Sequence, residues 1–430
     1  MNNAPRENPP KINDLSLSGG LPELRTQQLD CGARLHIYDG CDAPVVYLSA
    51  LVPGGIAEAP QPAVAALMGN MMREGSQNYP GEKLAEILDF NGAWIKSDPY
   101  SHHMKYSLYA LSSTLDSVLP PFVDMISRPT FPADKLESRR RSLAKRIEVS
   151  QTDVSYSSRC LSDKLSMGND HPLAKQDTPE RILAITTDDL RRFHDRFFTP
   201  SNIDLYLCGN ISDDIVRKII SSFNAIQPSG KANATVDIRR YRPEASGRRD
   251  ILHADALQSA VQISLPAIPR TDPDYIPLHL TVMALGGYFG SRLMLNIREE
   301  KGLTYGIGAS LMGNTDDANI LISAQTDNRN VDRLIEETIA EMRQMSENPP
   351  SGEELLRMKR YALSAHSGAL DSPVSIVDYH INYLLSGLPS GYYSAREQAI
   401  ADLTPETLSR MAAKYFRPDQ IRTVVAGNPA

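Results

Sequence analysis

The chain has 430 residues, of which 41% are hydrophobic and 23% are charged, and these proportions are ordinary for a soluble globular protein. The formal net charge of −7 is modest, and Lys and Arg are interspersed with acidic residues, so nucleic acid is not expected as the main partner. A chain of this length predicts two domains of roughly 200 residues each.

The N-terminal residues 1–24 are expected to form an extension ahead of the first domain. Residues 1–20 are polar, without the apolar stretch of a signal peptide, and no run in the chain approaches the length of a membrane span, roughly 18 apolar residues. We therefore expect a cytoplasmic protein with no membrane partner, and the periplasm stays open as an alternative. The cysteines show no CxxC spacing, which predicts free thiols at Cys31, Cys41, Cys160 and Cys208.

The first domain, residues 25–227, is expected to mix strands and helices. After two strands, a helical segment at 62–75 begins with proline and stops at Gly75. The turn signal Asn91-Gly92 separates a second helix from two further strands, and helices dominate afterwards. The predicted strands are 34–38, 45–52, 93–97 and 104–111, and the predicted helices after 62–75 are 81–90, 114–126, 133–150, 157–167 and 179–185.

A repeat divides the chain into two halves. The stretch from Thr186 to Asn210 reappears from Thr404 to Asn428, and both ends are displaced by 218 positions (404 − 186 and 428 − 210). Each copy reads as a helix with a Thr cap and acidic residues in its first turn, a proline-marked turn, and an apolar strand that ends in Gly-Asn. The repeat predicts two homologous α/β domains in an α+β protein.

The second domain, residues 246–430, follows a linker at 228–245 and repeats the order of the first. The arginine cluster at 239–242 is expected to be a solvated face of the linker. The predicted strands of the second domain are 260–267, 304–311, 319–325 and 421–426, and the predicted helices are 273–285, 291–300, 331–346, 352–370, 374–385 and 393–401.

The most site-like stretch is 285–305, which contains a glycine-rich turn and the phrase Arg298-Glu299-Glu300-Lys301-Gly302-Leu303-Thr304-Tyr305. This stretch resembles the second domain of the pitrilysin/insulinase family of zinc metallopeptidases, and residues 84–98 and 198–202 resemble its first domain. The resemblance covers nearly the whole chain after about residue 25. It implies a clamshell of two duplicated domains with antiparallel-rich sheets packed by helices, as in the processing peptidases.

The resemblance also implies a zinc motif that this chain lacks. In the family, an inverted His-x-x-Glu-His motif on the first helix binds the metal and activates water, and its positions correspond here to Ala66, Gly69 and Asn70. Alanine and glycine offer no ligand atom, and asparagine is a weak zinc ligand. A third family ligand corresponds to Glu148, which is expected to be a leftover or a surface acid. No histidine pair has HxxxH spacing, so neither a metal nor a catalytic residue is expected in this chain alone.

A second part of the family site is retained. In the family, the positions of Arg298 and Tyr305 reach across the clamshell to the substrate, and a guanidinium with a phenol suits a peptide carbonyl or carboxylate. The alternative is that these residues have no part in binding, with Arg298 in a surface ion pair with Glu299 or Glu300 and Tyr305 as a half-buried strand residue. The family also adds its peptide as a strand beside the segment that corresponds to Ala93, Trp94 and Ile95. Trp94 is as compatible with the core as with a platform for substrate.

Some members of the family divide these parts between two chains. The leading hypothesis is therefore a non-catalytic, substrate-binding subunit that completes the site of a zinc-bearing homologue, with zinc only in that partner and peptides as substrates. One alternative is a non-enzymatic scaffold or peptide-binding homodimer. A third alternative, a peptidase that uses a site not visible in the sequence, is weaker, and the chain is not expected to be active alone.

Overall fold

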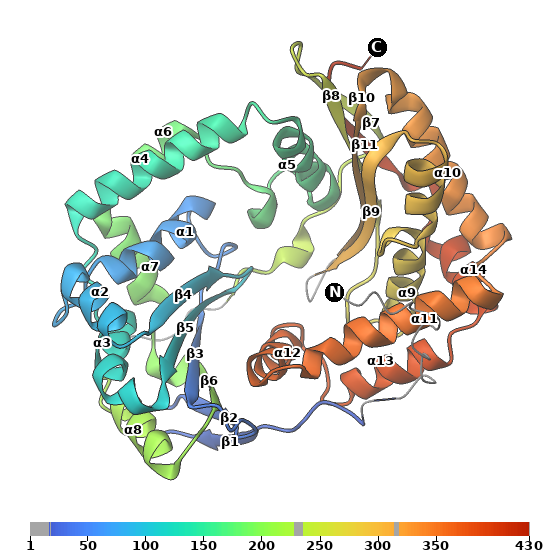
Figure 1. Cartoon of the computed structure of the whole chain (residues 1–430). Helices are drawn as coiled ribbons and strands as arrows, with labels where there is room; N and C mark the ends of the chain where they lie inside the picture. Colours follow the sequence, from blue (N-terminus) through green and yellow to red (C-terminus); the bar gives the residue numbers. More distant parts are fainter. Residues whose placement is uncertain (1–16, 18, 228–234, 314–317, 430) are drawn as a thin grey trace, which may run out of the picture.

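The computed structural model describes residues 17, 19–227, 235–313 and 318–429. Most of the predicted extension 1–24 and residues 228–234 of the predicted linker lie outside the described residues. The described part forms two halves, each a sheet with helices on its outer face, and the two sheets face one another across the molecule (Figure 1). The fold is therefore the duplicated α+β arrangement that the sequence predicts.

The first sheet has the strand order β1-β2-β6-β3-β5-β4. Its central strand β3 pairs antiparallel with β5, from Val45 opposite Leu111 to Pro53 opposite His103, and antiparallel with β6 on its other side. The β2–β6 pair is parallel. The strands are β1 (Arg25–Gln28), β2 (Arg34–Tyr38), β3 (Val45–Pro53), β4 (Trp94–Pro99), β5 (His103–Leu111) and β6 (Asp204–Gly209).

The second sheet has the strand order β7-β11-β8-β10-β9, which repeats the order β2-β6-β3-β5-β4 of the first. The parallel pair recurs as β7–β11, and β9 takes the edge place that β4 has in the first sheet. The strands are β7 (Gly247–Leu252), β8 (Gln258–Pro266), β9 (Thr304–Gly313), β10 (Ala318–Asp327) and β11 (Arg422–Gly427).

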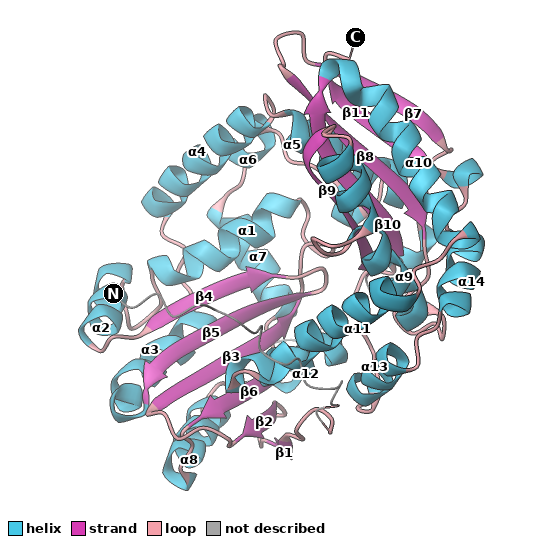
Figure 2. Cartoon of the chain, turned by 45° about the vertical axis from the view of Figure 1, so that its right-hand side comes forward, coloured by secondary structure: helices cyan, strands magenta, loops and turns pink. Residues whose placement is uncertain are grey.

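Helices cover the outer faces of the sheets and bury one hydrophobic core in each half (Figure 2). In the first half these are α1 (Pro62–Met71), α2 (Gly81–Phe90), α3 (Leu115–Ser127), α4 (Ala133–Ser150), α6 (Pro179–Leu183), α7 (Thr187–Phe197) and α8 (Asp213–Asn224). In the second half they are α9 (Tyr275–Gly286), α10 (Val331–Glu347), α11 (Gly352–Ser367), α13 (Tyr392–Ala401) and α14 (Pro405–Tyr415). The repeated helices α7 and α14 begin alike, because Thr186 and Thr404 each accept the backbone N–H three residues later.

One helix of each half packs against the sheet of the other half. Helix α5 (Val154–Met167) packs against β8 and β11 of the second sheet, where Ser166 Oγ donates to Ser264 Oγ at 2.9 Å. Helix α12 (Pro373–Leu385) packs against β6 of the first sheet and buries Val377 and Ile381 beside Tyr206. These two helices lie on the inner faces of the sheets and join the halves (Figure 1).

The sequence-based prediction missed three elements, the strands β1 and β7 and the helix α8. The strands β1 and β7 are largely polar and mostly exposed, so no alternation of apolar residues marks them, and each forms only because a neighbouring strand offers its edge. The helix α8 had a clear signal, because Ser212 caps it and Ile215, Ile219 and Phe223 recur at helical spacing.

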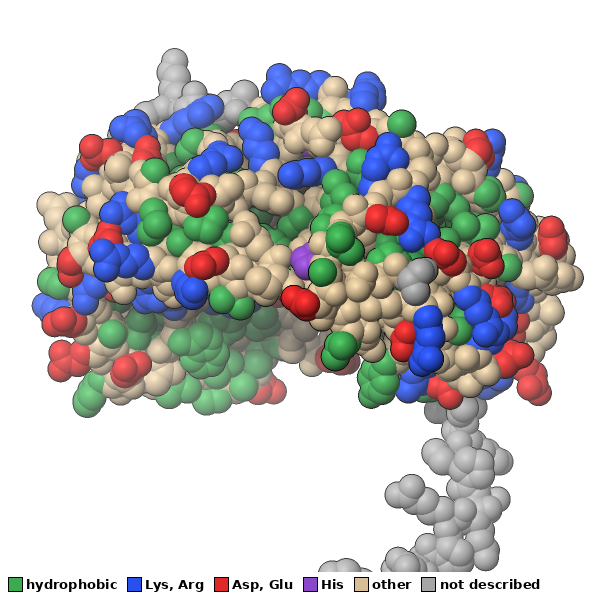
Figure 3. All heavy atoms as spheres, turned by 90° about the horizontal axis from the view of Figure 1, so that it is seen from above, with side chains coloured by type: hydrophobic (Ala, Val, Ile, Leu, Met, Phe, Trp, Pro, Cys, Tyr) green, Lys and Arg blue, Asp and Glu red, His purple; other side chains and the backbone are tan. Residues whose placement is uncertain are grey.

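Charged side chains of both signs are interspersed on the face of the molecule seen from above (Figure 3). The mixture agrees with the composition. The face that is drawn has no large patch of one charge sign. Among the described residues, no helix is both long enough and apolar enough to cross a bilayer.

Candidate functional site

The helix α1 carries the three positions that correspond to the zinc motif. Ala66 and Gly69 have no side-chain donor atom, and Asn70 Nδ2 donates to the backbone oxygen of Ala66 at 3.0 Å along the helix. Gly69 is buried, and a Cβ atom built on it would lie 3.1 Å from Cβ of Ser97 on β4. The helix therefore approaches the strand more closely than a side chain at residue 69 would ordinarily allow.

The guanidinium of Arg73 lies beside the same positions. It donates through Nη2 to Asn70 Oδ1 and through Nη1 to the backbone oxygen of Ile95, each at 3.3 Å. The single side-chain oxygen among the three motif positions thus faces a permanent cation. Because a guanidinium repels a divalent cation, these residues do not fit a zinc ion.

Glu148, the position of the third family ligand, lies near the end of α4 and is 59% exposed. Its carboxylate accepts from Lys145 Nζ at 3.0 Å. Within the described ranges, no group of three or more His, Cys, Asp or Glu has the arrangement of a metal site. The structure thus places Glu148 on the surface in an ordinary ion pair, which contributes little to stability.

Restoring the motif tests the part that Arg73 plays. A variant with Ala66→His, Gly69→Glu and Asn70→His is expected to bind zinc about 100-fold more weakly than the same variant with Arg73→Met added, because one unit charge near a divalent ion costs about 3 kcal/mol at intermediate dielectric. Equilibrium dialysis with metal analysis measures both affinities. Equal zinc affinities would show that the guanidinium does not oppose a metal at this helix.

Arg298 lies in a π-helical segment, η6 (Met294–Glu300), that takes the place of α2 in the second half. Leu293 and Ile297 anchor this segment in the core, and the backbone N–H of Lys301 donates to the oxygen of Asn296, five residues earlier. Gly302 ends the segment with φ +61°, a left-handed conformation that favours glycine. The sequence predicted an ordinary helix here, and π-helical turns occur often at functional sites.

The side chains of Arg298 and Tyr305 lie together. Arg298 Nε donates to the backbone oxygen of Tyr305 at 2.8 Å, and the guanidinium carbon lies 5.0 Å from the ring centre of Phe289 and 5.5 Å from that of Tyr305. The two rings hold the guanidinium by cation–π contacts. Arg298 also pairs with Glu299, as the structural alternative anticipated, but Tyr305 is 92% exposed rather than half-buried.

The end of β9 that carries Tyr305 meets the first half. Thr304 is opposite Thr326 on β10, and the adjacent Gln325 donates through Nε2 to Oγ of Ser155 at the start of α5. Helix α5 follows α4, on which Glu148 lies, after a short turn. The end of β9 that carries Tyr305 therefore lies near the start of α5, where the two halves meet (Figure 1).

The segment of Ala93, Trp94 and Ile95 lies at the edge of the first sheet, because β5 is the one strand of the described residues that pairs with β4. Ala93 and Ile95 are buried in the core, so their contacts with a peptide could come only from the backbone. Trp94 is 57% exposed and stacks on Tyr109 at 4.8 Å between ring centres. Trp94 is thus not a core residue, and a role as a platform for substrate stays a prediction.

The structure brings the predicted positions together in two groups. The motif helix and the β4 edge touch through Gly69 and Arg73, whereas Arg298 and Tyr305 form a separate cluster on the second half. Sequence reasoning missed Arg73 and Phe289. The signal for Arg73 was its place one turn after Asn70, and the signal for Phe289 was its place in the glycine-rich turn that precedes Arg298.

A duplicated clamshell whose first helix has Ala66, Gly69 and Asn70 at the metal-motif positions defines a class, namely relatives of two-domain metallopeptidases with an altered metal position. Residues 46–168 match the family profile described as Insulinase (Peptidase family M16), and residues 184–361 match the profile described as Peptidase M16 inactive domain. The chain belongs to the insulinase family, peptidase family M16.

Sequence relatives and a solved structure with the same fold come from several bacteria. The chain is 23% identical over 257 residues to the Helicobacter pylori protein named Non-peptidase homolog YmxG, a match that spans 59% of each chain. It is 22% identical over 285 residues to the Bacillus subtilis protein named Uncharacterized zinc protease YmxG, spanning 65% of this chain and 68% of that protein. A crystal structure from Pseudomonas fluorescens described as a peptidase M16 inactive domain has a TM-score of 0.86 and 24% identity, and covers 95% of this chain and 98% of its own.

Proposed function

We propose that this chain is the non-catalytic, substrate-binding subunit of a two-chain zinc metallopeptidase that acts on peptides. The observation that carries the proposal is the contrast between the two groups of residues. The guanidinium of Arg298 lies between the rings of Phe289 and Tyr305, while Arg73 donates to Asn70, the one position of the altered zinc motif that has a side-chain oxygen. Zinc belongs in this proposal to the partner subunit, a homologue with an intact His-x-x-Glu-His motif.

The residues of this chain would bind and orient the peptide. The Arg298 guanidinium can donate two further hydrogen bonds in a fixed fork, which suits a C-terminal carboxylate or a peptide carbonyl. The exposed Tyr305 hydroxyl adds a neutral donor seven positions later in the chain. The backbone of β4 can pair with an extended peptide, which gives affinity with little dependence on sequence.

A non-enzymatic scaffold or peptide-binding homodimer is the second candidate. The name of the Helicobacter pylori relative, Non-peptidase homolog YmxG, favours a function without hydrolysis for that protein. The two candidates differ in what Arg298 and the exposed Tyr305 do, because a scaffold does not need these side chains.

Reconstitution tests the proposal. The chain purified alone is expected to hold no stoichiometric zinc and to cleave no fluorogenic peptide. Mixing it with the zinc-bearing homologue from the same cell is expected to give hydrolysis that a chelator abolishes. Tightly bound zinc and chelator-sensitive hydrolysis in the chain alone would contradict the subunit proposal, and an inactive mixture that forms a stable complex would favour the scaffold.

A further inference from the structure

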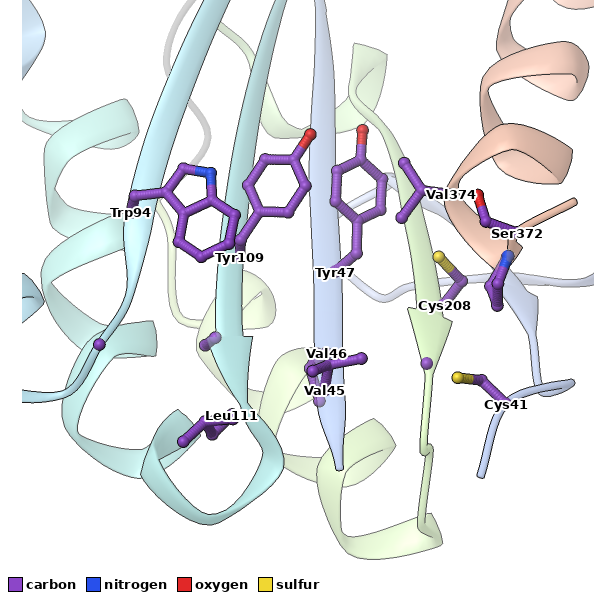
Figure 4. A pocket seen from close by; sticks show the side chains of 14 residues that line it. Cys41, Val45, Val46, Tyr47, Trp94, Tyr109, Leu111, Cys208, Ser372 and Val374 are labelled. Atoms are coloured by element: carbon purple, nitrogen blue, oxygen red, sulfur yellow. The ribbon is translucent and has the colours of Figure 1, made fainter. Parts of the chain in front are cut away.

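A cavity of about 320 Å³ lies on the inner face of the first sheet, the face turned away from the core of that half. Its floor is a row of three aromatic rings on neighbouring strands, Trp94 on β4, Tyr109 on β5 and Tyr47 on β3 (Figure 4). Its far wall is the start of α12, with Val374, which comes from the second half. The cavity therefore forms because α12 of the second half packs against the first sheet.

The lining of the cavity is almost wholly apolar. The ring of Tyr109 is 4.8 Å from that of Trp94, at an interplanar angle of 9°, and 4.9 Å from that of Tyr47. Tyr47 directs its hydroxyl to Ser107 Oγ at 3.1 Å, and among the described residues that line the cavity there is no Asp, Glu, Lys or Arg. Burial raises the pKa of the Cys208 thiol to about 12, so this wall is also neutral. A charged occupant would lose its hydration without a partner, whereas an apolar one would not.

The cavity lies next to the free edge of β4. Trp94 belongs both to the cavity floor and to that edge strand, and Gly92, just before β4, lines the cavity with no side chain to close it. Gly92 has φ +60°, and a Cβ atom there would meet open space. A peptide strand added beside β4 would carry alternate side chains on the face of Trp94, because strand side chains alternate with period two.

We infer that this cavity binds one large apolar side chain, such as leucine, methionine or phenylalanine, of an extended peptide whose backbone pairs with β4. The inference rests on the peptide binding of the proposed function and assigns that peptide a chemical class. The volume of the cavity is in the range of small-ligand pockets, about 300–1,000 Å³, and accommodates one such side chain. The continuity of the cavity with the edge strand is the reason for assigning it to a peptide rather than to a free small molecule.

The test uses pairs of short peptides in a serine and threonine background that differ at one position, leucine against serine. Trp94 is the only tryptophan of the chain, so its fluorescence reports binding at the cavity directly. The leucine peptide is expected to bind about 10- to 100-fold more tightly than the serine peptide, the ratio that burying a large apolar side chain gives. Binding of the leucine peptide is also expected to shift the emission of Trp94.

Two variants fill the cavity from opposite sides. Cys41→Phe, on the loop before β3, and Val374→Phe, at the start of α12, are each expected to abolish the preference for leucine while the serine peptide binds as before. The matched control is Leu257→Ala, because Leu257 is 89% exposed on the second half and does not line the cavity. Circular dichroism confirms that each variant is folded, and either filled variant suffices for the test.

The outcomes separate this inference from the proposed function. Equal binding of both peptides would overturn the inference and leave the proposed subunit role standing, since backbone pairing would be intact. Failure of both peptides to bind would overturn both. A shift of Trp94 emission by toluene, together with equal binding of the two peptides, would assign the cavity to a free apolar molecule and also overturn the inference.

Discussion

Replacing Arg298 by alanine in the reconstituted two-chain assembly is expected to lower kcat/KM about 10- to 100-fold, because a hydrogen bond from a charged group to substrate is worth about 1.5–3 kcal/mol. The loss should be large because the guanidinium is already oriented. Its contacts with Phe289 and with the backbone oxygen of Tyr305 fix the fork before substrate arrives, so little ordering is needed on binding. Initial rates with a fluorogenic peptide measure the effect.

Two further variants separate the contribution of the Tyr305 hydroxyl to activity from that of the Arg298 guanidinium. Tyr305→Phe removes only the hydroxyl and should cost about tenfold, and Arg298→Lys should recover only part of the activity, since an ammonium lacks the fork geometry. The matched control is Arg417→Ala, an exposed arginine paired with Asp419 before β11. Unchanged activity in Arg298→Ala and Tyr305→Phe, with the complex intact, would leave the scaffold as the better hypothesis.

The architecture could be predicted from the sequence because the repeat shows that the chain contains two copies of one domain. The caps at Thr186 and Thr404 and the strands that follow them recur at a fixed spacing, and two copies of one pattern imply two copies of one sheet order. The exchange of α5 and α12 could not be predicted in the same way. Amphipathic spacing shows that a helix buries one face, but it does not show which sheet that face meets.

The candidate site was predictable only where a motif spans a few residues. The phrase that contains Arg298 and Tyr305 gave that pair directly, and the structure places the two in contact. The contacts of Arg73 and the cavity beside Trp94 join segments that are far apart in sequence, such as Ile95 with Arg73 and Val374 with Tyr109. Such neighbours depend on tertiary packing, so local pattern carries no signal for them.

The helices α5 and α12, which each pack on the sheet of the other half, also lie next to the two groups of site residues. Helix α5 brings Ser155 of the first half to Gln325 beside the Arg298–Tyr305 pair, and α12 closes the cavity next to β4. Each half therefore completes a surface that belongs to the other. A mutation that loosens the contact between the halves should disturb both surfaces together.

The buried carboxylate of Glu58 holds the linker between the two halves to the first half. Its side chain is fully buried and accepts from Gly55 N–H at 2.9 Å, from Val236 N–H of the linker at 3.1 Å, and pairs with His102 Nδ1 at 2.6 Å. Burial alone would raise the pKa of this carboxyl, but the hydrogen bonds from His102 and the two N–H groups lower the pKa below its ordinary value. The ionised form is therefore the one that stabilises the fold.

Glu58→Ala is expected to lower the free energy of unfolding of the first half by about 3–5 kcal/mol, since it leaves a histidine and two N–H groups without their buried partner. Urea unfolding followed by Trp94 fluorescence measures it, with Glu336→Ala on the exposed face of α10 as the control. Because the pKa of Glu58 is lowered in the folded state, its contribution is complete above the ordinary carboxyl pKa, about 4.3, and is lost as pH falls through the folded value. The difference between the wild type and Glu58→Ala should therefore shrink in acid, and a difference that stays constant with pH would show that the ionised carboxylate is not what holds the linker to the first half.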